Sequence, residues 1–134
     1  MDLIFKINKP IDTVFDYLTD MQKFVSVHPV ISKIDSLSGN NYLVYETLKL
    51  GFIPFSFTYP VTIDQSFNDK KVLIRATVMK LTKIEMSYTL TTDNNSTIIN
   101  ETITFKSPLP IKSIMQNIFR KQHTLLFEKI EALK

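Results

Sequence analysis

The C-terminal residues 111–133 constrain the fold more than any other part of the chain. Apolar side chains recur there at i, i+3, i+4 and i+7 spacing: Ile111, Ile114, Met115, Ile118, Phe119, Leu126, Phe127, Ile130 and Leu133. This spacing predicts an amphipathic helix, which would be ~34 Å long at a rise of roughly 1.5 Å per residue. Because the apolar stripe is wide, the helix must lie across another apolar surface, and only a sheet is available to cover it.

Residues 30–107 are typical of consecutive β-strands. Apolar and polar side chains alternate with a period of two, and turn-forming clusters interrupt the alternation at 38–41, Gly51, 68–71, 80–83 and 93–96. About six strands fit between these turns. The gaps are too short for parallel crossover connections, so we expect the strands to form an antiparallel meander.

The N-terminal region combines one strand with two short helices. Residues 2–8 alternate as a strand does, and Pro10 ends that strand. Apolar side chains at helical spacing follow over residues 11–18. A second short helix is expected to begin after Asp20, a residue type that caps helices, and to end before Pro29, because the residue preceding a proline avoids the helical conformation.

These elements predict an α+β fold in one domain over residues 1–134, since roughly 100–200 residues form a domain. A curved antiparallel sheet of about seven strands would wrap around the long C-terminal helix, with two short helices after the first strand. A bent sheet and a straight helix contact each other best at their ends. We therefore expect the space between them to remain open as an internal pocket.

Composition excludes several kinds of site. The chain has no cysteine, which removes disulfides, thiolate metal sites and cysteine nucleophiles. Two glycines cannot build a glycine-rich phosphate-binding turn, and a net charge of +3 does not argue for nucleic acid. The histidines, His28 and His123, form no helical or hairpin ligand pair with Glu46 or Glu101. We expect neither a metal nor a cofactor.

The N-terminus, MDLIFKINKPIDTVF, lacks the basic region, the long apolar run and the small-residue cleavage site of a signal peptide. No segment approaches the roughly 18 uninterrupted apolar residues of a membrane span. We therefore expect a cytoplasmic protein without stable membrane insertion.

Three stretches resemble the START/SRPBCC superfamily, which includes birch-pollen-allergen-like proteins and polyketide cyclases/dehydrases. They are IFKINKPIDTVFDYLTDMQKFVSVHP at 4–29, YETLKLGFIPFSFTYPVTI at 45–63 and TITFKSPLPIKSIMQNIFRKQHTLLFEKIEALK at 102–134. The resemblance spans essentially the whole chain and implies the helix-grip fold. It is specific for fold and not for activity, because the superfamily contains lipid carriers, small-molecule binding proteins, cyclases and chaperone-stimulating domains without one shared catalytic signature.

Strand and helix periodicity together select the side chains expected to face the pocket. The predicted ligand-binding residues are Tyr42, Glu46, Phe55, Phe57, Tyr59, Ile74, Met86, Tyr88, Glu101, Met115, Phe119 and His123. Most are apolar or aromatic. The tyrosines can line an amphipathic ligand, or they can fill core and hydrogen-bond a partner at its rim.

Glu46, Glu101 and His123 are the candidates for chemistry. A carboxyl in an apolar pocket should have a raised pKa, which favours proton transfer, so either glutamate could anchor a ligand or act as a base. Alternatively, each could be a strand-end glutamate that reaches water, or could follow a bulge that shifts the phase. His123 could hydrogen-bond a ligand or Glu101, or could be an ordinary histidine at the flank of the helix. For His28 we expect a structural role at its turn.

The leading functional hypothesis is the binding of a small apolar or amphipathic molecule, such as a lipid, a polyketide-like or an isoprenoid compound. It rests on the resemblance and on an inward surface with few polar groups. Two alternatives remain open. One is a cyclase or dehydrase that uses an inward glutamate as base, and the other is a protein-interaction module without a ligand.

Overall fold

The computed structural model describes the whole chain except Gly51 and the side chain of Leu50. Its elements follow the predicted order, and the turn predicted at Gly51 lies outside the described residues. They are β1 (Asp2–Ile7), α1 (Ile11–Thr19), α2 (Met21–Val27), β2 (Ile31–Ser36), β3 (Asn41–Leu50), β4 (Ile53–Ser66), β5 (Lys71–Val78), β6 (Thr82–Asp93), β7 (Ser96–Lys106) and α3 (Lys112–Glu131).

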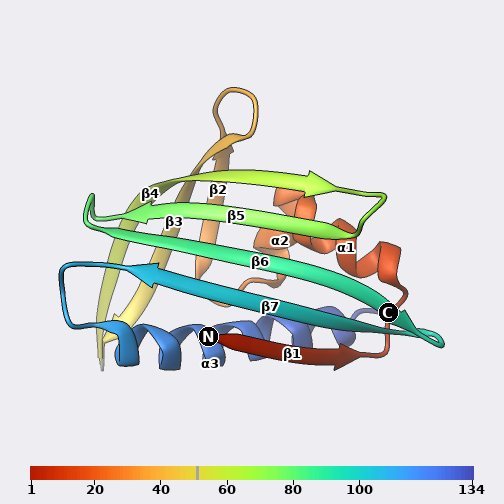
Figure 1. Cartoon of the computed structure of the whole chain (residues 1–134). Helices are drawn as coiled ribbons and strands as arrows, with labels where there is room; N and C mark the ends of the chain where they lie inside the picture. Colours follow the sequence, from red (N-terminus) through yellow and green to blue (C-terminus); the bar gives the residue numbers. More distant parts are fainter. Residues whose placement is uncertain (51) are drawn as a thin grey trace.

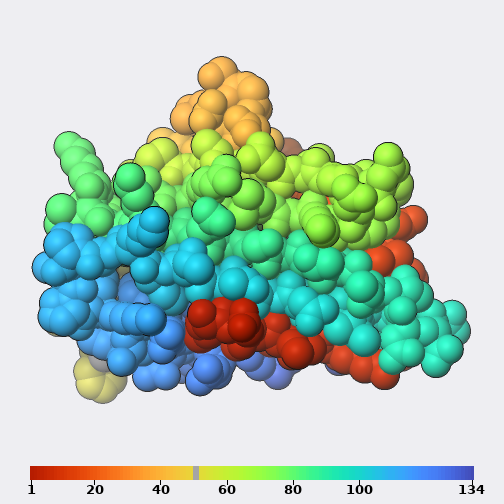
Figure 2. All heavy atoms as spheres, viewed as in Figure 1, coloured from red at the N-terminus to blue at the C-terminus, as the bar shows by residue number. Residues whose placement is uncertain are grey.

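The seven strands form one antiparallel sheet in the order β1-β7-β6-β5-β4-β3-β2. Strands β2 to β7 form the expected meander, and β1 closes one edge by pairing with β7, so that Leu3 lies opposite Glu101. Figure 1 shows the sheet curving around α3, with α1 and α2 gathered at one end. In Figure 2 the loop between β2 and β3, in orange at the top, projects from the side of the molecule that lies away from β1, in red. The predicted curved sheet around a C-terminal helix is confirmed.

The helix α3 is buried unevenly along its length. Leu126, Phe127 and Ile130 in its second half are at most 1% exposed, because they pack against the sheet. In the first half Phe119 is only half-buried, and Ile114 is 60% exposed. The apolar stripe that the sequence shows as continuous is therefore covered tightly at one end only. The other end of α3 leaves apolar surface open to a pocket.

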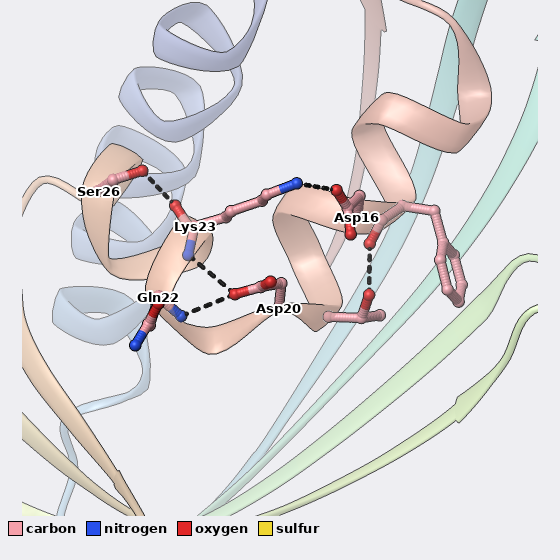
Figure 3. A network of polar contacts seen from close by, with 7 residues as sticks. Asp16, Asp20, Gln22, Lys23 and Ser26 are labelled. Atoms are coloured by element: carbon pink, nitrogen blue, oxygen red, sulfur yellow. Dashed lines mark hydrogen bonds and ion pairs between the residues drawn. The ribbon is translucent and has the colours of Figure 1, made fainter.

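The corner between α1 and α2 is held by local polar contacts, shown in Figure 3. Asp20 is the predicted cap of the second helix, and its Oδ1 accepts the backbone N–H groups of Gln22 and Lys23 at 3.0 and 3.2 Å. These are two of the donors that a helix N-terminus leaves without partners inside the helix. Lys23 also forms an ion pair with Asp16 of α1. The corner positions α2 beside the sheet, where Phe24 and Val27 enter the core.

Candidate functional site

Two adjoining pockets lie between the sheet and α3. The larger, the outer pocket, has a volume of ≈ 240 Å³. It is lined by Glu46, Leu48, Phe55, Phe57, Tyr59, Ala76, Val78, Met79, Leu81, Thr82, Ile84, Met86, Leu109, Ile111, Met115, Ile118, Phe119 and Gln122. The smaller, the inner pocket, has a volume of ≈ 40 Å³. It is lined by Met21, Phe24, His28, Ile31, Ile34, Val44, Glu46, Tyr59, Val61, Ile63, Ile74, Met86, Tyr88, Phe119, Gln122 and His123.

The outer pocket reaches solvent beside the turn between β5 and β6 and the loop before α3. Met79, Leu81 and Leu109 line it there and are 64%, 53% and 50% exposed. Phe55 also lines it and is 41% exposed. Exposed apolar side chains gathered around an apolar depression are unusual unless the surface meets a partner or a ligand.

Ten of the twelve predicted ligand-binding residues line one pocket or both. Phe55, Phe57 and Met115 line the outer pocket, whereas Ile74, Tyr88 and His123 line the inner one. The remaining four belong to both, and they are Glu46, Tyr59, Met86 and Phe119. The wall that the two pockets share therefore carries a carboxyl and a phenol among apolar side chains.

Tyr42 and Glu101 line neither pocket. Tyr42 lies near the start of β3, in a separate surface groove with Leu37 and Thr77. Strand periodicity identifies the face on which a side chain lies, but it does not say how far along the strand the pocket extends. Glu101 does face inward, yet it is buried beside His123.

Glu46 and Tyr59 form a polar pair at the shared wall. The two residues lie on the paired strands β3 and β4, and the Tyr59 hydroxyl donates a hydrogen bond to Glu46 Oε1 at 2.7 Å. Burial raises the pKa of the Glu46 carboxyl, and this effect outweighs the Tyr59 hydrogen bond, which lowers it. Burial also holds the pKa of Tyr59 well above its usual value, with the Glu46 charge adding to the effect. At neutral pH the phenol is therefore a hydrogen-bond donor.

Glu101 and His123 form a second polar pair, which is more deeply buried. Their side chains are 0% and 3% exposed, and Glu101 Oε2 lies 2.6 Å from His123 Nδ1. The contact is poorly aligned for a hydrogen bond, so these atoms and Glu101 Oε1 have no hydrogen-bond partner among the described residues. Tyr88 lies opposite Glu101 in the sheet. Burial, followed by the Glu101 charge, raises the pKa of Tyr88 well above its usual value.

His28 forms hydrogen bonds with the backbone of its own turn. Its Nδ1 accepts the N–H groups of Val30 and Ile31 at 3.2 and 3.1 Å. The pKa of His28 is lowered from 6.5 to about 3, mainly by burial, with smaller contributions from the charges of His123 and Lys129. The ring is therefore neutral in the folded protein at neutral pH and carries its proton on Nε2.

We expect this histidine to make folding sensitive to acid. The unfolded chain binds a proton at His28 below pH 6.5, whereas the folded chain does not until about pH 3. Stability should therefore fall with decreasing pH across that window, by about 2 kcal/mol between pH 8 and pH 5. Urea denaturation of the wild type and of His28→Asn, which keeps an acceptor but does not titrate, measures the difference. Equal pH dependence in both proteins would contradict this role of His28.

Gln122 is a pocket residue that sequence reasoning missed. It lines both pockets and is 7% exposed, and no described residue hydrogen-bonds its side-chain amide. A signal was present, because Gln122 lies three residues after Phe119 and four before Leu126, in the middle of the apolar stripe. The exposed pocket residues Met79 and Leu81 were missed because they lie in a turn, where strand periodicity does not apply.

The described residues contain no group of three or more side chains suited to hold a metal ion. None of the helices in the described part of the chain is both long enough and apolar enough to cross a membrane.

Comparison with known proteins places the chain in a family. The family model for CoxG, which is described as a subunit of carbon monoxide dehydrogenase, matches residues 4–118. No curated protein matches the sequence.

Among solved structures, Ara h 8.0201 is 17% identical with a TM-score of 0.76, over 98% of this chain and 93% of that one. A START superfamily protein from Mycobacterium smegmatis is 12% identical with a TM-score of 0.75, over 100% and 98% of the two chains. The di-domain ARO/CYC BexL from the BE-7585A biosynthetic pathway is 9% identical with a TM-score of 0.81, over 98% of this chain and 46% of that one. These structures share the helix-grip fold, and this chain belongs to the CoxG family of the START/SRPBCC superfamily.

Proposed function

We propose that this protein binds a small apolar or amphipathic molecule, such as a lipid, a polyketide-like or an isoprenoid compound, in the outer pocket. The observation that carries the proposal is the pocket of ≈ 240 Å³ under the first half of α3, which is lined mainly by aliphatic and aromatic side chains. Pockets of this character, with a few polar groups among apolar walls, are typical ligand sites. Membership of a superfamily that contains ligand-binding proteins supports the same function.

Removal of the guest from water would drive binding. Each 100 Å² of apolar ligand surface that enters the pocket contributes about 2.5 kcal/mol before the costs of association are subtracted. The half-buried Met86, Met115 and Phe119 line the pocket, and their side chains can adjust to the shape of a guest. Methionine in particular adjusts to irregular guests, because its side chain is unbranched and polarizable.

Exposed apolar side chains would help such a guest to enter. Met79, Leu81 and Leu109 give an apolar path from the surface into the outer pocket. Phe52 is fully exposed, but it lines neither pocket and is not part of this path. We assign entry to the three residues that line the pocket.

Two measurements test the proposal. Extraction of the purified protein with organic solvent, followed by mass spectrometry, should release an apolar molecule in stoichiometric amount. The delipidated protein should then bind pyrene, a hydrocarbon whose emission reports the polarity of its surroundings, with one site per chain and an emission typical of an apolar environment. An empty extract together with no saturable pyrene binding would contradict the proposed function.

A second candidate function is catalysis of the cyclase or dehydrase type. It is favoured by the pair Glu46–Tyr59, because a carboxyl of raised pKa and a phenolic donor share the wall of an apolar pocket. The similarity to an ARO/CYC structure is consistent with this chemistry. If the extracted molecule is turned over, Glu46→Gln should abolish turnover and retain binding. Retained turnover in that variant would exclude Glu46 as the base.

A further inference from the structure

The inner pocket is too small for an apolar chain but large enough for a small polar group. Its volume of ≈ 40 Å³ corresponds to about three waters, at roughly 10–15 Å³ for each. It adjoins the outer pocket through a wall that Glu46, Tyr59, Met86, Phe119 and Gln122 share. A molecule whose body occupies the outer pocket could therefore place one end in the inner pocket.

Polar groups with unused hydrogen-bonding capacity line the inner pocket. His28 is 8% exposed and has committed its Nδ1 to the backbone, which leaves the Nε2–H as its remaining donor. Gln122 is 7% exposed, and its amide has no partner among the described residues. Glu46 uses Oε1 for the Tyr59 hydroxyl and keeps a second oxygen. Polar groups in a mostly apolar lining are usually hydrogen-bonded to protein or to water, so a polar group of a ligand would find partners here.

The charges around the pockets select a neutral occupant. Among the described residues, no lysine or arginine lines either pocket. The acidic side chains are Glu46, which lines both, and Glu101, which contacts His123 at the inner pocket. An anionic head such as a carboxylate or a phosphate would be desolvated there beside acidic groups without a permanently charged partner, which is costly.

We propose that the inner pocket is a head-group subsite for a single neutral oxygen function, a hydroxyl or a carbonyl, of an amphipathic ligand whose apolar body fills the outer pocket. This inference rests on the proposed function. The Gln122 amide and the His28 Nε2–H donate to the head oxygen, and the free Glu46 oxygen accepts from a hydroxyl. The ligand enters head first, because the outer pocket is the compartment that reaches solvent at Met79 and Leu109.

The test compares two amphiphiles of the same chain length in displacing pyrene at pH 8. For the wild type, 1-dodecanol should bind at least about tenfold more tightly than dodecanoate. Gln122→Met keeps the length of the side chain and removes its amide. It should weaken 1-dodecanol binding relative to pyrene binding by about 3- to 10-fold, as expected for one neutral hydrogen bond.

Gln116→Met is the matched control, because Gln116 lies on the same helix and lines neither pocket. It should alter the binding of neither pyrene nor 1-dodecanol. Equal binding of dodecanoate and 1-dodecanol, or a Gln122→Met variant that behaves as Gln116→Met does, would overturn the head-group subsite while the pyrene site stands. Failure of the wild type to bind pyrene would overturn the proposed function and this inference with it.

Discussion

Replacing His123 with leucine is expected to lower the free energy of unfolding by about 3–5 kcal/mol. The substitution removes the group that lies 2.6 Å from Glu101 Oε2 and leaves a carboxyl whose side chain is 0% exposed. Leucine fills much of the space of the imidazole. The loss in free energy of unfolding therefore reports the cost of leaving the buried Glu101 carboxyl without its partner, and not the cost of a cavity. Urea denaturation followed by circular dichroism at pH 7 gives the value.

The double variant Glu101→Met/His123→Leu distinguishes a buried polar pair from simple loss of packing. Removing both partners eliminates the stranded group, so the double variant should recover at least about 2 kcal/mol relative to His123→Leu alone. Glu128→Met, on the exposed face of α3, is the control and should change stability by less than about 0.5 kcal/mol. A double variant no more stable than His123→Leu would show that the pair does not account for the loss.

Filling the outer pocket from the sheet is expected to weaken ligand binding strongly. Ala76 is on β5, is 5% exposed and lines the outer pocket opposite α3. Ala76→Phe places an aromatic ring in space of ≈ 240 Å³, so the fold should accept it. Pyrene affinity should fall by at least about tenfold, which corresponds to roughly 1.4 kcal/mol. Fluorescence titration measures the affinity, and circular dichroism verifies the fold.

The neighbouring Thr77 provides the control for this substitution. Successive residues of a strand point to opposite faces of a sheet, and Thr77 lines neither the outer nor the inner pocket. Thr77→Phe should therefore retain pyrene binding. If Ala76→Phe unfolds the protein, the space between the sheet and α3 is too tightly packed to hold a guest. If it folds and binds pyrene as the wild type does, the guest lies elsewhere.

The fold could be predicted from the sequence because its elements have strong and distinct periodicities. The alternation over residues 30–107 identified the six strands of the meander, and the capping aspartate Asp20 and Pro29 bounded α2. The apolar stripe over residues 111–133 indicated a helix across a sheet, which α3 confirms. These patterns are local, and one arrangement buries their apolar faces together. Tertiary packing therefore had little freedom to override the local preferences for strand or helix.

The site was harder to predict from the sequence, because the extent of a pocket depends on the distance between the sheet and α3, which local patterns do not specify. The stripe of α3 does not reveal that Ile114 is exposed while Ile130 is fully buried. Periodicity likewise placed Tyr42 and Glu46 on one face, although only Glu46 lines the pockets. The pairing of Glu101 with His123 was one of two contacts suggested for His123, and only the packing of α3 on β7 selects it.

The central claim is that an apolar guest occupies the space between the sheet and the first half of α3. Its most direct test is the NMR spectrum of the protein labelled with ¹³C at its methionine methyl groups, recorded during titration with pyrene. Met79, Met86 and Met115 line the outer pocket and Met1 lines neither pocket. The aromatic ring current of bound pyrene should shift the resonances of Met86 and Met115 strongly and leave that of Met1 in place. Unchanged Met86 and Met115 resonances at saturating pyrene would contradict the claim.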